Sequence, residues 1–203
     1  MKLYEDKPTI CIAGPARLSY ANLFKPRKND LSQKTEFSTV LLIPKNPHQY
    51  QSDGKAEGAG ITKCIKAAAA DKWGEKAGSY RNPLKDGDIE KNGDGESKHP
   101  GHWFITVKTG EEYPPMIINP AREPFGLESP EQKRNSWQSG DWAKVKISFK
   151  AYESGPNKGV SGYLQAVQFL HKDEPFGGGA STNDFDNEAG EGVDIAEDVD
   201  PFQ

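Results

Sequence analysis

One predicted strand carries the residues that are best suited to chemistry in this sequence. Side chains alternate between the two faces of a strand, so residues 142–152 divide into an apolar face and a basic face. The apolar face predicts contact with a core and holds Ala143, Val145, Ile147, Phe149 and Ala151. The other face, predicted to be exposed, holds Trp142, Lys144, Lys146, Ser148, Lys150 and Tyr152. Such a face suits a single nucleic-acid strand, because cations follow phosphates and rings stack on bases.

A second basic and aromatic cluster lies between residues 17 and 28, where Pro26 indicates a loop. It combines four cations with two rings, namely Arg17, Tyr20, Phe24, Lys25, Arg27 and Lys28. Basic patches interleaved with aromatics are typical of nucleic-acid grooves, although we expect at least one of the two rings to be a core residue. Arg81, in a polar stretch, is a further candidate phosphate contact. Trp103 lies on the more apolar face of residues 101–108 and is predicted to join the core.

Signals for catalysis are poor. The four histidines form no HExxH motif, and there is no P-loop, GxGxxG or GxSxG pattern. The acidic stretches 86–88 and 94–96 do not complete a calcium loop. We therefore predict a protein that is not an enzyme and that needs no metal or other cofactor. Cys11 and Cys64 lie far apart and are expected to be reduced thiols.

Charge is unevenly distributed along the chain. The formal net charge is −4, yet residues 1–172 carry 26 basic and 20 acidic residues, a net +6. Residues 173–203 contain ten acids and no Lys or Arg. This segregation predicts a nucleic-acid-binding body with an acidic arm. The arm could compete with DNA for the body or dock on a partner protein through Phe185, Glu197, Asp198, Asp200 and Phe202. A tail that merely adds solubility is the alternative.

The predicted elements give a mainly β fold. Residues 176–203 begin as a Gly-rich linker and continue as an acidic tail that we expect to be disordered, which leaves residues 1–175 as the body. A helix is predicted at 61–77, loops at 80–101 and 120–140, and a hairpin turn at 153–159. Strands are predicted at 9–13 continuing into 16–20, and at 35–43, 102–109, 116–119, 141–152 and 160–171.

Strands, one helix and long loops suit a small OB-fold-like barrel, with a sandwich as the alternative. An OB-fold would place its helix between the third and fourth strands. No apolar run approaches the ~20 residues of a membrane span, and the polar N-terminal stretch does not resemble a signal peptide. We therefore expect a cytoplasmic protein without membrane contact.

Several stretches together resemble a phage-encoded family of replication single-stranded DNA-binding proteins with an OB-fold core. In chain order they are 16–26, 38–45, 82–88, 146–152, 157–161 and 164–168. The resemblance implies a protein that coats single strands during phage replication and recombination without sequence preference. Residues 198–202 also resemble the tails of bacterial and phage single-strand binders, which end in acids and a Phe and recruit replication proteins. Here Gln203 follows Phe202, which departs from that pattern.

Three functions therefore remain open. The first is a sequence-tolerant single-stranded DNA-binding protein whose tail recruits replication or recombination proteins. The second is a protein-interaction or virion-assembly module that acts through its tail, in which the lysines of 142–152 are only a solvated face that protects a sheet edge. The third is an RNA-binding OB domain. Self-association between copies of the chain is kept as a further partner hypothesis.

Overall fold

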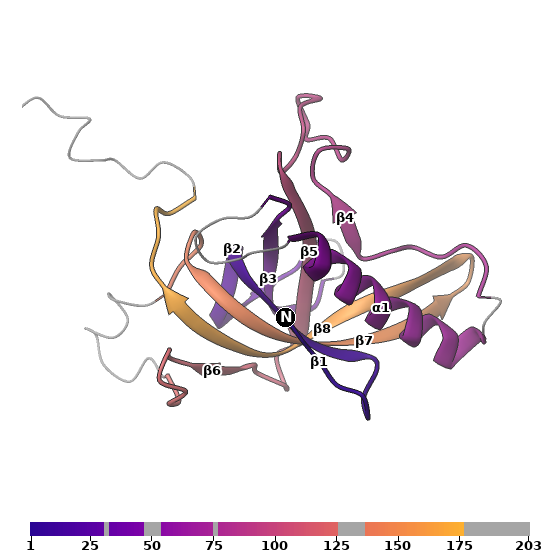
Figure 1. Cartoon of the computed structure of the whole chain (residues 1–203), viewed down its shortest axis with the longest axis horizontal. Helices are drawn as coiled ribbons and strands as arrows, with labels where there is room; N and C mark the ends of the chain where they lie inside the picture. Colours follow the sequence, from indigo (N-terminus) through magenta and orange to yellow (C-terminus); the bar gives the residue numbers. More distant parts are fainter. Residues whose placement is uncertain (31–32, 47–53, 75–76, 126–136, 177–203) are drawn as a thin grey trace, which may run out of the picture.

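The computed structural model describes residues 1–30, 33–46, 54–74, 77–125 and 137–176, and these form one sheet and one helix (Figure 1). The elements in chain order are β1 (Lys2–Leu3), β2 (Ile10–Lys28), β3 (Thr35–Pro44), α1 (Gly54–Trp73), β4 (Leu84–Asp86), β5 (His102–Gly110), β6 (Met116–Ile118), β7 (Trp142–Ser154) and β8 (Asn157–His171). The mainly β prediction is confirmed. The predicted strand at 116–119 is present as β6, whereas the short strands β1 and β4 were not predicted.

Five strands close into a barrel. β5, β3, β2, β7 and β8 are antiparallel neighbours in that order. The circle closes where β5 pairs in parallel with β8, with Val107 opposite Gly162. The predicted OB-fold-like barrel is therefore confirmed, and the sandwich is not found. The helix α1 lies between the second and third barrel strands, not between the third and fourth as an OB-fold would have it.

The strand β2 is longer than the sequence indicated. The predicted strands 9–13 and 16–20 belong to one strand that continues to Lys28, so the loop predicted for the basic cluster is wrong. The pairing with β7 shifts register between Ala13 and Ala16. Gly14 lies in this irregularity at φ +107°, where a Cβ would come within 2.6 Å of the Ala143 carbonyl oxygen. Only glycine suits this position.

The helix α1 is shifted toward the N-terminus relative to the prediction of 61–77. It begins at Gly54 and ends at Trp73, where Gly74 adopts φ +73° and its N–H donates to the Ala70 carbonyl at 2.8 Å. A left-handed glycine of this kind commonly ends a helix. The early start contains the buried Glu57, whose Oε1 accepts a 2.5 Å hydrogen bond from the Gly14 N–H. This tertiary contact attaches the first turn of α1 to β2.

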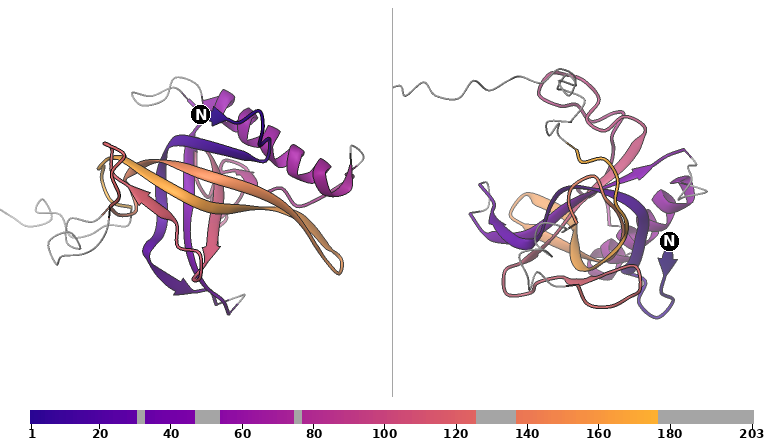
Figure 2. Two further views of the ribbon diagram at one scale, coloured as in Figure 1. Left: turned by 90° about the horizontal axis from the view of Figure 1, so that it is seen from below. Right: turned by 90° about the vertical axis from the view of Figure 1, so that its left-hand side faces the viewer.

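The hairpin of β7 and β8 confirms the predicted strands 141–152 and 160–171 and extends both. The pairing continues to Ser154 opposite Asn157, which shortens the predicted turn. The hairpin projects beyond the barrel beside the C-terminal end of α1, whereas the β2–β3 hairpin projects elsewhere (Figures 1 and 2). Trp73 of α1 donates to Glu153 at 3.1 Å, and the Lys158 ammonium lies 4.3 Å from the Trp73 ring centroid.

The core lies inside the barrel and beneath α1. The predicted apolar face of β7 is confirmed, because Ala143, Val145, Ile147 and Phe149 are at most 2% exposed. Trp103 packs against the core with Ile105 and Val107, as predicted. Cys11 and Cys64 are buried free thiols. No helix in the described ranges is long and apolar enough to cross a membrane. Apart from Phe176, the predicted linker and tail lie outside the described residues.

The contact between Glu57 and Gly14 predicts a large loss of stability in Glu57→Ala. That substitution leaves a buried backbone N–H without its acceptor, which costs about 1–3 kcal/mol of unfolding free energy. Glu57→Gln keeps an acceptor oxygen of the same reach and is the matched control, so its loss should be smaller. Urea denaturation of the three proteins measures the difference. An unfolding free energy of Glu57→Ala equal to that of the unsubstituted protein would contradict this role.

Candidate nucleic-acid interface

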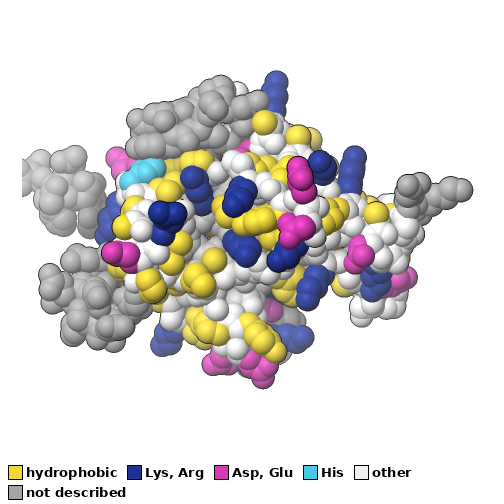
Figure 3. Space-filling view, turned by 60° about the horizontal axis from the view of Figure 1, so that its bottom comes forward, with side chains coloured by type: hydrophobic (Ala, Val, Ile, Leu, Met, Phe, Trp, Pro, Cys, Tyr) yellow, Lys and Arg dark blue, Asp and Glu magenta, His cyan; other side chains and the backbone are white. Residues whose placement is uncertain are grey.

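The outer face of β7 carries a row of lysines, which we call the β7 face. It consists of Lys144, Lys146 and Lys150 together with the rings beside them. Lys150 is exposed, and the other two are half-buried. Among the described residues, none of the three forms an ion pair with a carboxylate. Figure 3 shows Lys and Arg side chains gathered near the middle of the underside, with hydrophobic side chains and some Asp or Glu side chains among them.

Trp142, the aromatic residue predicted at the start of the β7 face, does not contribute an exposed ring. Trp142 is only 6% exposed, so the expectation that it lies exposed is wrong. Its Nε1 donates to Asp173 Oδ2 at 2.7 Å, and its ring stacks on His171 at 5.8 Å. A contact with a residue 31 positions later is invisible to strand alternation.

Two tyrosines that sequence reasoning missed lie beside the lysines instead. The Lys146 ammonium is 5.8 Å from the ring centroid of Tyr4, and that of Lys150 is 5.5 Å from Tyr163. Tyr163 is 40% exposed. Its outward position in the predicted strand 160–171 could have been found by alternation, because the neighbouring Gly162 and Leu164 are buried. Tyr4 belongs to a segment for which no element was predicted.

Arg81 and Tyr152 flank the start of β8. Tyr152 is opposite Gly159 in the β7–β8 pairing, and Arg81 forms a parallel bridge to the same Gly159. Arg81 is exposed, and its backbone N–H donates to the Lys158 carbonyl at 2.9 Å. Both predicted residues therefore lie at the hairpin end of the β7 face.

Some residues of the cluster at 17–28 are exposed, and others pack against the core. Tyr20 is 72% exposed at φ +49°, and Lys25, Arg27 and Lys28 are also exposed. Phe24 instead packs against the core, with its ring 6.2 Å from Phe169. The expectation that one of the two rings is a core residue is confirmed.

Arg17 is engaged by the segment that follows β8. Its Nε donates to the Gly140 carbonyl at 2.9 Å, and its Nη2 donates to the Glu174 carbonyl at 2.6 Å. The guanidinium also lies 3.7 Å from the Asp173 carboxylate and 4.1 Å from the Phe176 ring centroid. The Arg17 side chain thus connects β2 with residues 173–176. Its contact with DNA stays a prediction.

The predicted residues form two separate groups. Arg17 is opposite Trp142, the first residue of β7, so β2 beyond this point continues past the end of β7. Lys146 is opposite Ile12, on the other side of that pair. The cations at 25–28 and those of the β7 face therefore lie in opposite directions along β2. Their role in DNA binding remains a prediction.

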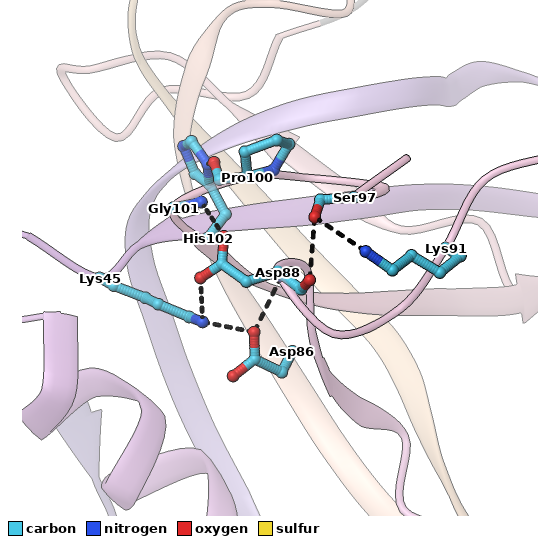
Figure 4. Close-up of polar contacts among 8 residues, drawn as sticks. All are labelled: Lys45, Asp86, Asp88, Lys91, Ser97, Pro100, Gly101 and His102. Atoms are coloured by element: carbon cyan, nitrogen blue, oxygen red, sulfur yellow. Dashed lines mark hydrogen bonds and ion pairs between the residues drawn. The ribbon is translucent and has the colours of Figure 1, made fainter. Parts of the chain in front are cut away.

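The acidic loop at 86–88 is occupied by a lysine (Figure 4). Lys45 contacts Asp86 and lies 2.6 Å from Asp88 Oδ2, while the Gly101 N–H donates to Asp88 Oδ1 at 2.6 Å. The hydrogen bonds from Lys45 lower the pKa of both carboxyls. The described residues contain no group of three or more side chains that could hold a metal ion. This cluster attaches β4 to the end of β3.

Comparison with known proteins decides the family. The family model described as the ssDNA-binding protein of Enterobacter phage Enc34 matches residues 9–196. The chain belongs to this family. A search of curated proteins finds no match.

Solved structures of the family are similar over most of their length. The single-stranded DNA-binding protein from bacteriophage Enc34 in complex with ssDNA has a TM-score of 0.67 and 26% identity, over 86% of this chain and 92% of that one. A second structure of the single-stranded DNA-binding protein from bacteriophage Enc34 has a TM-score of 0.65 and 26% identity, over 90% of this chain and 91% of that one. Bacteriophage T7 gp2.5, a single-stranded DNA-binding protein, shares the fold alone, with a TM-score of 0.55 and 16% identity over 85% and 97%.

The contacts of Asp173 predict a pH-dependent stability. The hydrogen bond from Trp142, then that from the Glu174 N–H, lowers the pKa of Asp173. A depressed carboxyl pKa stabilises the fold above the unfolded pKa, and this contribution is lost as the pH falls through the folded pKa. Asp173→Asn should therefore lower the unfolding free energy at neutral pH, by roughly 0.5–1 kcal/mol for this partly exposed group. The deficit should shrink in acid.

Urea denaturation at a series of pH values measures this effect. Asp94→Asn, at an exposed loop position, is the matched control and should leave stability unchanged at every pH. A deficit of Asp173→Asn that stays constant from neutral to acid pH would argue against the electrostatic origin.

Proposed function

We propose that this protein binds single-stranded DNA with little sequence preference and acts in phage DNA replication and recombination. The observation that carries the proposal is the row of Lys144, Lys146 and Lys150. None of the three forms an ion pair with a carboxylate among the described residues, and Lys146 and Lys150 each lie beside a tyrosine ring. Ammonium groups that are not neutralised can follow a phosphate backbone, and tyrosine rings can stack on bases. Membership of a family named for ssDNA binding supports the same function.

The exposed part of the 17–28 cluster gives the strand a second basic surface. Arg27 and Lys28 line a groove of about 290 Å³ between β2 and β3, which also contains Asp30 and Glu36. The Glu36 carboxylate is paired with Lys108. OB-folds bind oligonucleotides on the face of their second and third strands and on the loop between the first and second. In this barrel that loop joins β2 to β3 and lies next to the groove. The proposed DNA path therefore includes Tyr20, Lys25, Arg27 and Lys28.

Substitution of the three β7-face lysines tests the function. The triple change Lys144→Ala, Lys146→Ala and Lys150→Ala should weaken binding to oligo-dT. It should also reduce the slope of log affinity against log salt by about 2, because each lost phosphate contact on a single strand contributes about 0.7. Fluorescence titration at several salt concentrations measures both quantities.

The matched control removes the same charge elsewhere, at the exposed lysines 55, 66 and 91. It should leave the slope nearly unchanged. Equal effects of the two triple substitutions would indicate that only net charge matters. No effect of the β7-face substitutions would favour an interaction module that acts through its tail.

We also propose that the acidic segment after Phe176 competes with DNA for the body and recruits replication proteins. Support comes from the charge distribution, since residues 173–203 hold ten acids and no Lys or Arg. A tethered polyanion has a high effective concentration at a basic surface. The aromatic residues Phe185 and Phe202 within the acids suit docking on a partner.

Deletion of residues 177–203 tests the competition. The shortened protein, which keeps Phe176 on Arg17, should bind oligo-dT more tightly than the full chain at low salt. The difference in oligo-dT affinity between the two proteins should become smaller as the salt concentration rises, because screening weakens the attraction between tail and body. Titration of both proteins side by side measures it. Unchanged or weaker binding after the deletion would refute the competition.

A further inference from the structure

A groove of about 560 Å³ lies beside the irregular part of β2, and we call it the β2 groove. One wall is the stretch 21–25 of β2. The other wall consists of residues 137–139 together with Pro175 and Phe176. Its volume falls within the range of about 300–1,000 Å³ that is usual for small-molecule sites.

Hydrogen bonds hold the two walls together. The Ala21 N–H donates to Ser139 Oγ at 2.9 Å and joins the first wall to the second. Within the second wall, the Phe176 N–H donates to the Ser139 carbonyl at 3.4 Å. Arg17 connects the same segments, because it donates to Gly140 and Glu174 and lies against the Phe176 ring. The groove is therefore formed before any ligand arrives, which lowers the entropic cost of binding.

Three aromatic rings line the groove. Trp137 stacks on the core residue Phe169, with ring centroids 4.5 Å apart and planes 7° apart. Phe24 stacks on the same Phe169 at 6.2 Å. Phe176 is held on the Arg17 guanidinium and is 39% exposed. Aromatic rings held in place at the surface of a groove are suited to stacking on an unpaired base.

The β2 groove adjoins the groove between β2 and β3 described above, which is lined by cations and by two acids. Asn22 lines both of them, and the groove between β2 and β3 carries Arg27 and Lys28. Lys25 lines the β2 groove itself, and Tyr20 directly precedes its first wall. A single strand whose phosphates follow these cations would bring its bases to the aromatic rings.

We propose that the β2 groove is a base-binding subsite, which receives an unpaired nucleobase against Trp137, Phe24 and Phe176. This inference rests on the proposed single-stranded DNA binding and deepens it. Arg17 then acts as a positioning residue for the subsite, because it holds Phe176 in the wall. In this proposal the β2 groove binds an uncharged base of the strand, whereas the β7 face binds its charged phosphates.

The test compares two oligonucleotides of equal length and equal phosphate charge, oligo-dT and an abasic strand. Phe176→Ala in the full chain should reduce the preference for oligo-dT over the abasic strand by at least about fivefold. Fivefold corresponds to the lower end of the stacking contribution of one base. The salt slope should stay unchanged, because no cation is lost. Tyr113→Ala is the matched control, since it removes an exposed ring that does not line the groove.

Crosslinking of the unsubstituted protein gives a second measurement that needs no variant. Single-stranded DNA carrying 5-iodouracil is irradiated in the complex, and the crosslinked peptides are identified by mass spectrometry. Crosslinks to Trp137, Phe24 or Phe176 support the subsite, and this result decides the matter if Phe176→Ala fails to fold.

Failure of the subsite and failure of the function are distinguishable. If the unsubstituted protein does not bind oligo-dT at low salt, both proposals fall. If it binds, but Phe176→Ala weakens both oligonucleotides equally and crosslinks lie only outside the groove, the subsite falls while DNA binding stands. A docked aromatic residue of the tail would instead show as a crosslink yield in the groove that rises only after deletion of residues 177–203, and this also overturns the subsite in the full chain.

Discussion

The architecture depends on β2, which hydrogen-bonds to β3 along one edge and to β7 along the other. These two partners do not cover the same length of it. β7 leaves β2 at Arg17, and β3 continues with it to Lys28. The outgoing part of β2 therefore has one edge without β7, and residues 139–141 form hydrogen bonds with part of that edge. Lys144 and Lys146 of the β7 face lie where β2 is paired with β7. The cations at 25–28 and the β2 groove lie along the part of β2 that β7 does not reach.

Sequence reasoning succeeded where a contact is local. The alternation in residues 142–152 predicts which side chains of β7 enter the core, because a strand that is buried on one face repeats every second residue. It failed at Trp142 and Arg17, whose partners Asp173, Glu174 and Phe176 come from a segment far along the chain. The strand β2 was shortened in the prediction because Pro15 and Pro26 lie within it, and proline is normally confined to strand edges and bulges.

A count of charges overstates the cations that can meet a polyanion. Lys45, Lys85 and Lys108 each pair with a carboxylate of the body, as Arg17 does with Asp173. Such pairs contribute to local structure and are already neutralised. The lysines of the β7 face differ because none of them forms an ion pair with a carboxylate among the described residues, and Lys146 and Lys150 each lie beside a tyrosine ring. The identity of the candidate interface is therefore set by the neighbours of each lysine, which the sequence alone does not reveal.

The parallel closure of the barrel has a consequence for how the chain acquires its structure. β5 and β8 meet at Val107 and Gly162, so the closing pair joins residues that are 55 positions apart. Contacts between distant residues slow folding, because the loop entropy must be lost before the contact is gained. During synthesis, β2, β3 and β5 emerge first and cannot form a closed circle. The barrel is completed only after β8 has left the ribosome. Until then the part of β5 beyond its pairing with β4 lacks its partner, and β2 lacks its second neighbour until β7 has emerged.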